Sequence, residues 1–311
     1  MNFDKIKGVL FGTAVGDALG LGTEFLSKKE VKKYYPQGLY SYDQISIRHK
    51  NLWARGEWTD DTEQMLCILD SLIENKKIDI KDIAYRFHRW AKTDGRGIGY
   101  TTYRVLSAKS FLTNPKAAAK EIWLESKKQL APNGGVMRTS VLGIWEYSDK
   151  EKVIKNATDV CQITHYDPRC AASCVLLSYA ISLLMQGKNR ISVFKEIKEL
   201  SKKYGKEVYE CLNDLETKDI YELELDDRDS MGYTLKTLAA GFWTLMNAKN
   251  FKDGLIKIVN QGGDADTNGA VAGALLGANF GFRDIPKEYV DGLEGKNRLM
   301  KKFDALIKIM G

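Results

Sequence analysis

Apolar residues along the chain recur mainly at the spacing of an α-helix. In residues 62–75, TEQMLCILDSLIEN, they include Met65, Leu66, Leu69 and Leu72, which fall on one face of a helix with about 3.6 residues per turn. Similar faces occur in nine further segments, 80–91, 116–130, 151–164, 170–186, 192–212, 232–247, 251–260, 268–278 and 298–310. The pattern predicts an all-α protein of ten or so helices.

Signals for β-strands are few. The stretch GLYSYDQISI, residues 38–47, is the best candidate, and it is compatible with a short hairpin or an irregular loop. The chain has only five prolines, no repeat of fixed period and no Ser/Pro-rich or Gly/Ser-rich linker. We therefore expect residues 1–311 to form a single domain.

Composition and charge narrow the class of protein. Hydrophobic residues make up 44% of the chain and charged residues 28%, which is typical of a soluble globular protein. The net charge of +6 comes from scattered lysines, whereas nucleic-acid binding would need a concentrated basic patch. The longest apolar stretch, CVLLSYAISLLM, has about a dozen residues, fewer than the roughly 18 of a membrane span. The sequence thus predicts neither a membrane segment nor a nucleic-acid-binding surface.

The cysteines and the N-terminus indicate a cytoplasmic protein. An odd number of cysteines within largely apolar runs favours reduced, buried thiols over a disulfide framework. The start MNFDKIKGVLFGTAVGDALG imitates a signal peptide only weakly, because Asp17 interrupts the apolar run early, and we expect a mature cytosolic start. The five cysteines are Cys67, Cys161, Cys170, Cys174 and Cys211.

Two acidic clusters open predicted helices about two hundred positions apart, GEWTDDTEQMLCILD and QGGDADTNGAVAGALLGANFG. Aspartate and threonine are good N-caps and suit the positive end of the helix dipole, each cap being worth about 1 kcal/mol. Asp60 and Glu63 also have the spacing of a capping box. Capping accounts for one acid per helix, but each cluster has two.

The surplus acids favour a metal site. Two carboxylates about 4 Å apart repel by roughly 4 kcal/mol at an effective dielectric constant near 20, and a divalent cation relieves this repulsion. Carboxylate and hydroxyl oxygens are the ligands of Mg²⁺, Mn²⁺ and Ca²⁺. Gly269, Gly273 and Gly277 form a stripe that lets another helix approach closely, either to join the two clusters or simply for tight core packing. We infer that the clusters can face each other and hold two metals, with helix capping as the alternative.

Further motifs add a resemblance to a known family. In chain order they are GVLFGTAVGDALGLGTEF, WTDDTEQM, DGRGIGYTT, PNGGVMRTS, ITHYDP and GGDADTNGAVAGALLG. Each is weak alone, but together, in this order over nearly the whole chain, they resemble the ADP-ribosylglycohydrolases. That family includes the dinitrogenase reductase-activating glycohydrolases and the hydrolases of ADP-ribosyl-serine and ADP-ribosyl-arginine.

The resemblance implies an all-α, orthogonal multi-helix bundle with a binuclear Mg²⁺ centre, or alternatively Mn²⁺, in its middle. It implies hydrolysis of the glycosidic bond at C1″ of ADP-ribose attached to an acceptor. The implied catalytic residues are Glu24, Asp61 and Asp94. The implied metal ligands are Thr59, Asp60, Asp61, Asp264, Asp266 and Thr267. The implied substrate-binding residues are Gly97, Ile98, Gly99, Asn133, Gly134, Gly135, Val136 and His165.

Physical chemistry gives these residues plausible roles. Glycine loops expose backbone N–H groups to a diphosphate, and VMRTSVLGIWEY after Gly134-Gly135 predicts a helix N-terminus there, although PNGG alone reads as a plain turn. Glu24 is the candidate general base or acid, and Asp94 either shares that role or braces the GRGIG loop. Asp17, within the first helix, is expected to be a structural hydrogen-bonding group.

Several alternatives stay open. Cys161, His165, Cys170 and Cys174 form a C-x3-H-x4-C-x3-C array that weakly suggests zinc, but the thiols lie in apolar helical faces. Trp53 and Trp58 flank the first acidic cluster and either border a pocket or pack in the core. The competing functions are a non-catalytic binder of ADP-ribose or nucleotide, and a structural role such as that of the related lens crystallins.

The acceptor is not indicated by the sequence. Arginine, serine, a nucleic-acid base and a free metabolite all remain candidates, so nucleic acid enters only as a modified substrate. The segments expected to contact the acceptor, residues 28–53 and 213–231, contain no interpretable motif. We expect a monomer.

Overall fold

The structure is a computed structural model that describes residues 2–45 and 52–311. Within these ranges it contains helices and no strand, only an isolated bridge between Pro132 and Tyr233, and it confirms the predicted all-α class. The α-helices are α1 (Phe3–Gly20), α2 (Lys28–Tyr34), α4 (Asp60–Asn75), α5 (Ile80–Thr93), α6 (Tyr100–Leu106), α7 (Pro115–Glu125), α8 (Lys150–Cys161), α9 (Pro168–Met185), α10 (Arg190–Ser201), α11 (Lys206–Asn213), α12 (Thr234–Asn247), α13 (Phe251–Val259), α14 (Ala265–Phe280), α15 (Lys287–Gly292) and α16 (Lys296–Met310).

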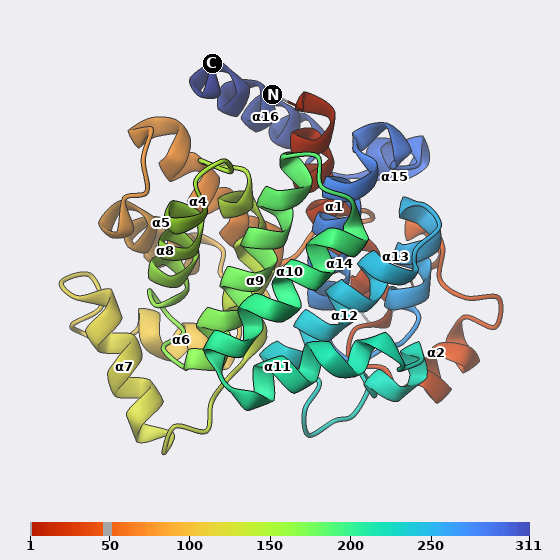
Figure 1. The fold of residues 1–311 in the computed structure, drawn as a ribbon, viewed down its shortest axis with the longest axis horizontal. Helices are drawn as coiled ribbons and strands as arrows, with labels where there is room; N and C mark the ends of the chain where they lie inside the picture. The colour runs from red at the N-terminus through yellow and green to blue at the C-terminus, as the bar shows by residue number, and fades with distance from the viewer. Residues whose placement is uncertain (1, 46–51) are drawn as a thin grey trace.

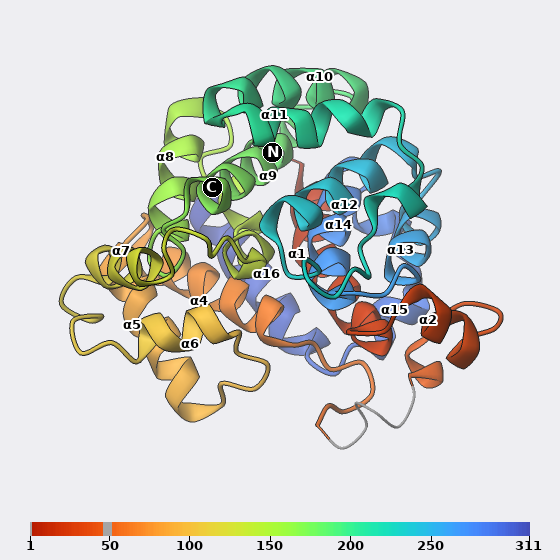
Figure 2. The same ribbon diagram turned by 90° about the horizontal axis from the view of Figure 1, so that it is seen from below.

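Short 3₁₀ helices connect many of these elements. They are η1 (Leu21–Thr23), η2 (Tyr42–Gln44), η3 (Asn133–Arg138), η4 (Ser140–Gly143), η5 (Lys202–Tyr204), η6 (Asp214–Glu216), η7 (Ile220–Leu223) and η8 (Phe282–Asp284). Figures 1 and 2 show α1, α9 and α14 in the interior, with α5, α6 and α7 on one side and α2, α13 and α15 on the other.

Helices α1 and α14 pack antiparallel with their backbones in contact. Glycines line the crossing on both sides, so that a Cβ atom built on Gly16 would lie 1.9 Å from the carbonyl oxygen of Gly269. A Cβ atom on Gly273 would lie 2.0 Å from the carbonyl oxygen of Gly12. The predicted glycine stripe thus serves close helix packing, and its partner is a second stripe in the first helix of the chain.

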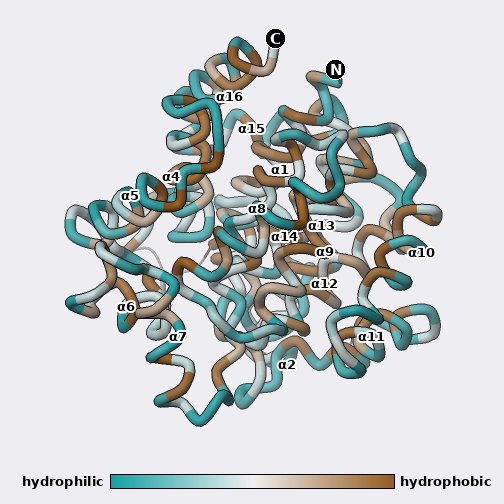
Figure 3. Tube along the Cα trace, turned by 60° about the vertical axis from the view of Figure 1, so that its left-hand side comes forward, coloured by the Kyte–Doolittle hydropathy of each residue, from teal (hydrophilic) through white to brown (hydrophobic). Residues whose placement is uncertain are grey.

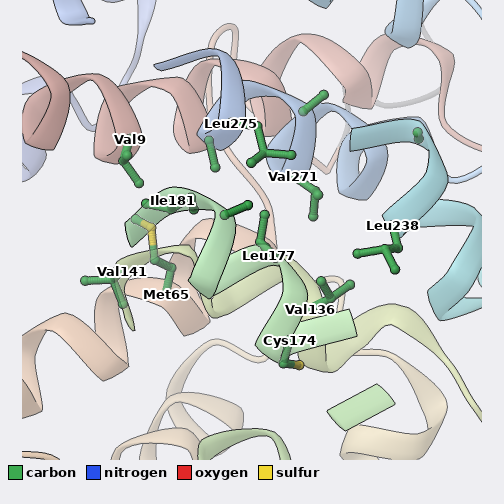
Figure 4. Packing of buried hydrophobic residues seen from close by; sticks show 14 of the residues in the cluster. Val9, Met65, Val136, Val141, Cys174, Leu177, Ile181, Leu238, Val271 and Leu275 are labelled. Atoms are coloured by element: carbon green, nitrogen blue, oxygen red, sulfur yellow. The ribbon is translucent and has the colours of Figure 1, made fainter. Parts of the chain in front are cut away.

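The core surrounds α9, which is apolar on all sides. This helix is long and apolar enough to cross a membrane by length and composition, but 89% of that window is buried inside the protein. A second candidate span arises only if α2 is joined to the chain before it across a bend of 87°. Figure 4 shows Cys174, Leu177 and Ile181 of α9 among core side chains of other elements, which include Val9, Met65, Val136, Val141, Leu238, Val271 and Leu275. Figure 3 shows hydrophilic positions concentrated along the outer helices, as burial of the apolar faces requires.

The structure corrects several predicted elements. The helix expected over 192–212 is broken into α10 and α11 at Gly205, whose φ of 107° is a conformation that favours glycine. The helix expected over 116–130 ends at Glu125, and Lys127 and Lys128 have positive φ. Residues 38–45 of the candidate hairpin form an irregular segment around η2, while 46 and 47 lie outside the described residues.

Candidate active site

The start of α4 is fixed by a buried aspartate of α1. Asp17, wholly buried, accepts hydrogen bonds from the backbone N–H groups of Thr59 (3.0 Å) and Thr62 (3.0 Å), and from the Thr62 hydroxyl (2.6 Å). Burial raises the pKa of Asp17 to about 6, although the hydrogen bonds from Thr62 and Thr59 favour its charged form. Asp17 therefore has the structural role expected of it, and it attaches the first acidic cluster to α1.

Thr59, and not Asp60, is the N-cap of α4. Its Oγ1 lies 3.4 Å from the backbone N–H of Asp61, which donates to it. The Glu63 side chain turns away, accepting from Trp58 Nε1 at 2.8 Å and pairing with Arg298, so the predicted capping box is absent. Asp60 and Asp61 are consequently both buried acids in the first turn of α4 and neither caps the helix.

A double glycine brings Glu24 next to the second cluster. Gly262 and Gly263 have φ of 72° and 67°, and a Cβ atom on Gly263 would lie 1.9 Å from a backbone oxygen. Gly263 exchanges two backbone hydrogen bonds with the segment after Glu24, from Phe25 N to its carbonyl (2.6 Å) and from its N–H to Leu26 O (2.8 Å). Asp264 follows at the start of α14, where its Oδ2 accepts from Asn133 Nδ2 at 2.8 Å.

The two acidic clusters meet. Thr267 Oγ1 donates to Asp61 Oδ2 at 3.3 Å across 206 positions of sequence. Carboxylate oxygens of Glu24, Asp264 and Asp266 all lie within 4.8 Å of one another. The first cluster therefore contacts the second through Asp61, and Glu24 joins the acids of the second cluster.

Burial and mutual repulsion make these carboxyl groups hard to ionise. Burial raises the pKa of Asp60 and Asp61 well above the usual range, and the neighbouring charges of Asp17 and Asp264 raise both further. The pKa of Asp266 is raised well above its usual range by burial, then by Glu24, Asp264 and Asp61. Asp61 Oδ1 is buried and has no hydrogen-bond partner among the described residues. This all-oxygen set of crowded donors, with one orphaned oxygen, fits hard divalent cations.

One cavity of about 300 Å³ adjoins these acids and takes in part of the predicted substrate loops. Of the predicted substrate-binding residues, Gly97, Gly99, Asn133, Gly134 and His165 line it. The cavity is completed by residues that were not singled out as substrate-binding residues. Leu130 lies outside the quoted motifs, and the others belong to them, namely Phe25, Tyr100, Thr101, Thr102, Pro132 and Met137.

The other three predicted substrate-binding residues face the packed interior. Ile98 is half-buried against the core, and Val136 is completely buried. A Cβ atom on Gly135 would lie 3.1 Å from Cys161 Sγ and 3.3 Å from Cys174 Sγ, so this glycine permits close packing against the thiols. The helix expected after this loop is formed by the short 3₁₀ helices η3 and η4, and η3 begins at Asn133, before the two glycines.

Glycine is required where the two substrate loops come closest to other groups. Gly97 has φ of 80°, and a Cβ atom there would lie 2.7 Å from Asp60 Oδ1. A Cβ atom on Gly134 would lie 3.0 Å from the His165 ring. Asp94 directly follows α5 at the surface, where it accepts a hydrogen bond from Arg96 Nε at 2.9 Å. It therefore braces the GRGIG loop and does not line the cavities next to the acids.

A second cavity of about 510 Å³ lies on another side of the same acids. It shares Glu24, Phe25, Asp60, Gly97 and Asp266 with the first, and adds Leu52, Trp53, Thr59 and Arg96. The Arg96 guanidinium lies 4.6 Å from the Trp53 ring centroid and donates to Leu52 O at 2.8 Å and Glu57 Oε1 at 2.5 Å. Trp53 therefore borders a cavity, whereas Trp58 is buried against Gly295.

The cysteine and histidine array does not form a metal cluster. Cys161 Sγ contacts His165 O and Cys170 Sγ contacts Pro132 O, and burial raises the pKa of both thiols well above the usual range. In the part of the chain that the structure describes, the one group of three or more clustered metal-binding side chains is Glu24, Asp264 and Asp266. The weak suggestion of zinc is therefore dropped.

Comparisons with known proteins identify the family of the chain. The sequence pattern of the ADP-ribosylglycohydrolase family matches residues 2–310. The chain is 29% identical over 314 residues to the ADP-ribosylarginine hydrolase Tri1 of Serratia proteamaculans, covering 98% of this chain and 79% of that protein. It is 28% identical over 316 residues to the ADP-ribosyl-dinitrogen reductase glycohydrolase of Rhodospirillum rubrum, covering 99% and 97%.

A solved structure described as an ADP-ribosylglycohydrolase-related protein complex has a TM-score of 0.80 and 27% identity, covering 99% of both chains. The fold, the order of the motifs and the relatives agree over almost the whole length. The chain therefore belongs to the ADP-ribosylglycohydrolase family, and it is an enzyme that hydrolyses bonds to ADP-ribose.

Proposed function

We propose that the protein is a divalent-metal-dependent hydrolase that cleaves the C1″ glycosidic bond of ADP-ribose attached to an acceptor. The observation that carries this proposal is the contact between Thr267 Oγ1 and Asp61 Oδ2, 3.3 Å long, which joins the two acidic clusters at the wall of the first cavity. A non-catalytic binder of ADP-ribose would have no need for so many carboxyl groups whose ionisation is opposed by burial.

Two Mg²⁺ ions, or Mn²⁺ in their place, are the proposed cofactors. The residues that would hold them are Thr59, Asp60, Asp61, Asp264, Asp266 and Thr267. Such cations supply Lewis acidity, which polarises substrate oxygens and lowers the pKa of water toward neutrality. Their positive charge also stabilises the ionised carboxylates, whose pKa values are raised in the protein alone.

The ADP-ribose part would occupy the cavity between the GRGIG and PNGG loops. Gly134, without a side chain, would let the PNGG loop approach the diphosphate closely, and Gly97 and Gly99 would likewise let the GRGIG loop approach the distal ribose. The Asn133 side chain is held by Asp264 and by Thr237 Oγ1 at 2.9 Å, so it links the substrate cavity to the acids.

Hydrolysis breaks the bond from C1″ to the acceptor nitrogen or oxygen and forms a bond from C1″ to a water oxygen. One water proton stays on the new hydroxyl group, and the other ends on the leaving group. Positive charge develops on the sugar ring in the transition state, and the nearby carboxylates of Asp60 and Asp61 would stabilise it. Glu24, which borders both cavities, is the proposed proton carrier, while Asp94 stays at the loop.

We assign the acceptor to the second cavity, because it adjoins the same acids but lacks Asn133, Gly134 and His165. Arginine is the acceptor that we favour. A guanidinium stacks on aromatic side chains. Phe25 supplies one here, Trp53 already carries the Arg96 guanidinium on its ring, and Glu24 and Asp266 offer negative charge. The Serratia relative, named an ADP-ribosylarginine hydrolase, supports the same choice.

The experiment is incubation with ADP-ribosyl-arginine, ADP-ribosyl-serine and ADP-ribosylated nucleic acid, each with Mg²⁺ or with EDTA. Chromatography of released ADP-ribose gives the readout. We expect release from the arginine substrate with Mg²⁺ and none with EDTA. Release from no substrate, together with ADP-ribose binding by calorimetry, would support the non-catalytic binder instead.

A further inference from the structure

Arg138, the last residue of η3, is a fully buried cation with no carboxylate partner among the described residues. Its guanidinium donates to Gln64 Oε1 and, at 2.5 Å, to Thr164 Oγ1, and its central carbon lies 4.3 Å from the Phe87 ring centroid. An unpaired buried charge costs several kcal/mol. A charge kept at such a cost next to an active site calls for a functional reason.

The first hydrogen-bond chain from Arg138 leads to the acids. A guanidinium has donors and no acceptor, so the Gln64 atom that faces it must be the carbonyl oxygen. The amide nitrogen of Gln64 is thereby turned toward Asp60, and Nε2 donates to Asp60 Oδ2 at 2.7 Å. Arg138 thus fixes the orientation of Gln64, and Gln64 fixes one oxygen of Asp60.

The second chain leads to the substrate cavity. Thr164 Oγ1 accepts from Arg138 and lies 2.7 Å from His165 Nδ1. Among the described residues Nδ1 is the one acceptor within reach of the Thr164 hydroxyl hydrogen, so we assign the hydroxyl as the donor to Nδ1. The ring proton of neutral His165 must then sit on Nε2. This edge of the ring lies beside Gly134 at the cavity wall, and Nε2 has no hydrogen-bond partner among the described residues.

The charge state of His165 agrees with this assignment. Burial and the positive charge of Arg138 lower the pKa of His165 well below its usual range, so the ring is neutral near pH 7. The hydrogen bond at Nδ1 then fixes the tautomer of the neutral ring, with an acceptor at Nδ1 and a donor at Nε2. It presents one N–H group to the cavity.

We propose that Arg138 is a positioning residue that sets the direction of two hydrogen-bond chains, one ending on Asp60 and the other on His165, whose Nε2–H donates to an oxygen atom of the bound ADP-ribose. The role toward ADP-ribose rests on the proposed function. The direction of the two chains does not, and can be measured in the protein without metal or substrate.

The tautomer of His165 tests the second chain directly. The protein has only three histidines, so long-range ¹H–¹⁵N spectra of ¹⁵N-labelled protein are simple. Loss of one signal in the His165→Gln variant assigns that signal to His165. We expect the metal-free protein to give an Nε2–H imidazole over pH 6–8. Thr164→Ser keeps the hydroxyl and should keep this signature, whereas Thr164→Val should lose it. An Nδ1–H or doubly protonated ring in the unsubstituted protein would overturn the proposal.

Binding measurements separate positioning from a purely structural role. Thr164→Val should weaken ADP-ribose binding by about tenfold or more in calorimetry while leaving Mn²⁺ affinity unchanged. Gln64→Met should mainly affect the metal. It should weaken Mn²⁺ binding, measured by electron paramagnetic resonance, by about 10–100-fold, as the loss of a group that orients a metal ligand does. Arg138→Lys keeps the charge without the planar fork and should impair both.

If Thr164→Val and Gln64→Met lower the thermal midpoint but leave the tautomer and both affinities unchanged, Arg138 is only a structural cation and the proposal fails. If the unsubstituted protein binds neither Mn²⁺ nor ADP-ribose while its tautomer is as expected, the proposed function fails and the direction of the chains stands.

Discussion

Gly16 of α1 and Gly269 of α14 touch through their backbones, with each glycine facing the carbonyl oxygen of the other. One turn further along α1, Gly20 meets Ala265, where α14 begins and the second acidic cluster is placed. Asp17 sits between these two glycines and holds the first acidic cluster. The helix crossing therefore sets the distance between the two halves of the active site.

Adding a side chain at this helix crossing should destabilise the protein. A Cβ atom on Gly16 would lie 1.9 Å from Gly269 O, a contact that only a backbone shift relieves. We expect Gly16→Ala to lower the free energy of unfolding by about 3 kcal/mol, at the upper end of overpacking effects. Urea denaturation measures this change. Gly99→Ala is the control, since its Cβ would meet no atom within 4 Å and its φ is ordinary.

Asp61→Asn should abolish metal-dependent hydrolysis and the thermal shift caused by Mg²⁺ with ADP-ribose. In EDTA the same variant should be more stable than the unsubstituted protein, by about 1 kcal/mol, because a buried charge in a repelling cluster is removed. Calorimetric unfolding with and without Mg²⁺ tests both halves. Asp94→Asn serves as the matched control at the surface, and retention of the metal effect in Asp61→Asn would exclude Asp61 as a ligand.

The stability of the metal-free protein should rise as the pH falls from 8 to 6. The folded-state pKa is about 6 for Asp17 and is raised well above the usual range for Asp60, Asp61 and Asp266. In this window the folded state binds more protons than the unfolded state, which contributes about 1.4 kcal/mol per pH unit for each extra proton.

Urea denaturation in EDTA at several pH values measures this dependence. Excess Mg²⁺ should reverse it, because the ion binds the ionised carboxylates and adds about 2.7 kcal/mol at a hundred times its Kd. If the free energy of unfolding of the metal-free protein instead increased toward pH 8, the buried carboxyl groups would not have the raised pKa values on which this prediction rests.

Glu24→Gln should lower turnover by about 10²–10⁴-fold, as expected when a general acid or base is lost, while ADP-ribose still binds. Glu24 borders both cavities, whereas Asp94 is held at the surface by Arg96. Asp94→Asn should therefore change turnover far less. Steady-state kinetics on ADP-ribosyl-arginine give the comparison, and equal losses in the two variants would return Asp94 to the mechanism.

Trp53→Ala should raise KM for the acceptor-bearing substrate and leave the affinity for free ADP-ribose unchanged. The ring borders the second cavity and supports Arg96, but the first cavity does not include it. Kinetics combined with calorimetry of ADP-ribose separate the two effects. Weaker binding of free ADP-ribose would show that the cavities have been assigned the wrong way round.

Helical periodicity could predict most of this fold because the apolar faces are long and the buried helices are nearly continuous in apolar residues. It failed where local backbone conformation decides the outcome. Gly205 splits a periodic segment because of its positive φ, and the loop after Pro132 forms η3 although its sequence allows an α-helix. The short helices α2, α6 and α15 also went unpredicted, since seven or fewer residues show little periodicity.

The acids of the site could be found from sequence because each cluster holds more carboxyl groups than helix capping accounts for. Their partners could not, since the pairing of Thr267 with Asp61 and of Asn133 with Asp264 depends on how α1, α4, η3 and α14 pack. Gln64 had a faint signal, four positions after Asp60 on the same helix face. The cavity lined by Trp53 and Arg96 had none, because its walls come from separate loops.

The antiparallel seam between α1 and α14 also bears on how the protein is made. The partner of the first helix begins 245 positions after that helix ends, between Gly20 and Ala265. At synthesis rates of about 5–20 residues per second, the partner follows roughly 12–50 s later. During that interval the glycine face of α1 lacks the helix against which it packs in the folded protein, so this seam forms late in synthesis.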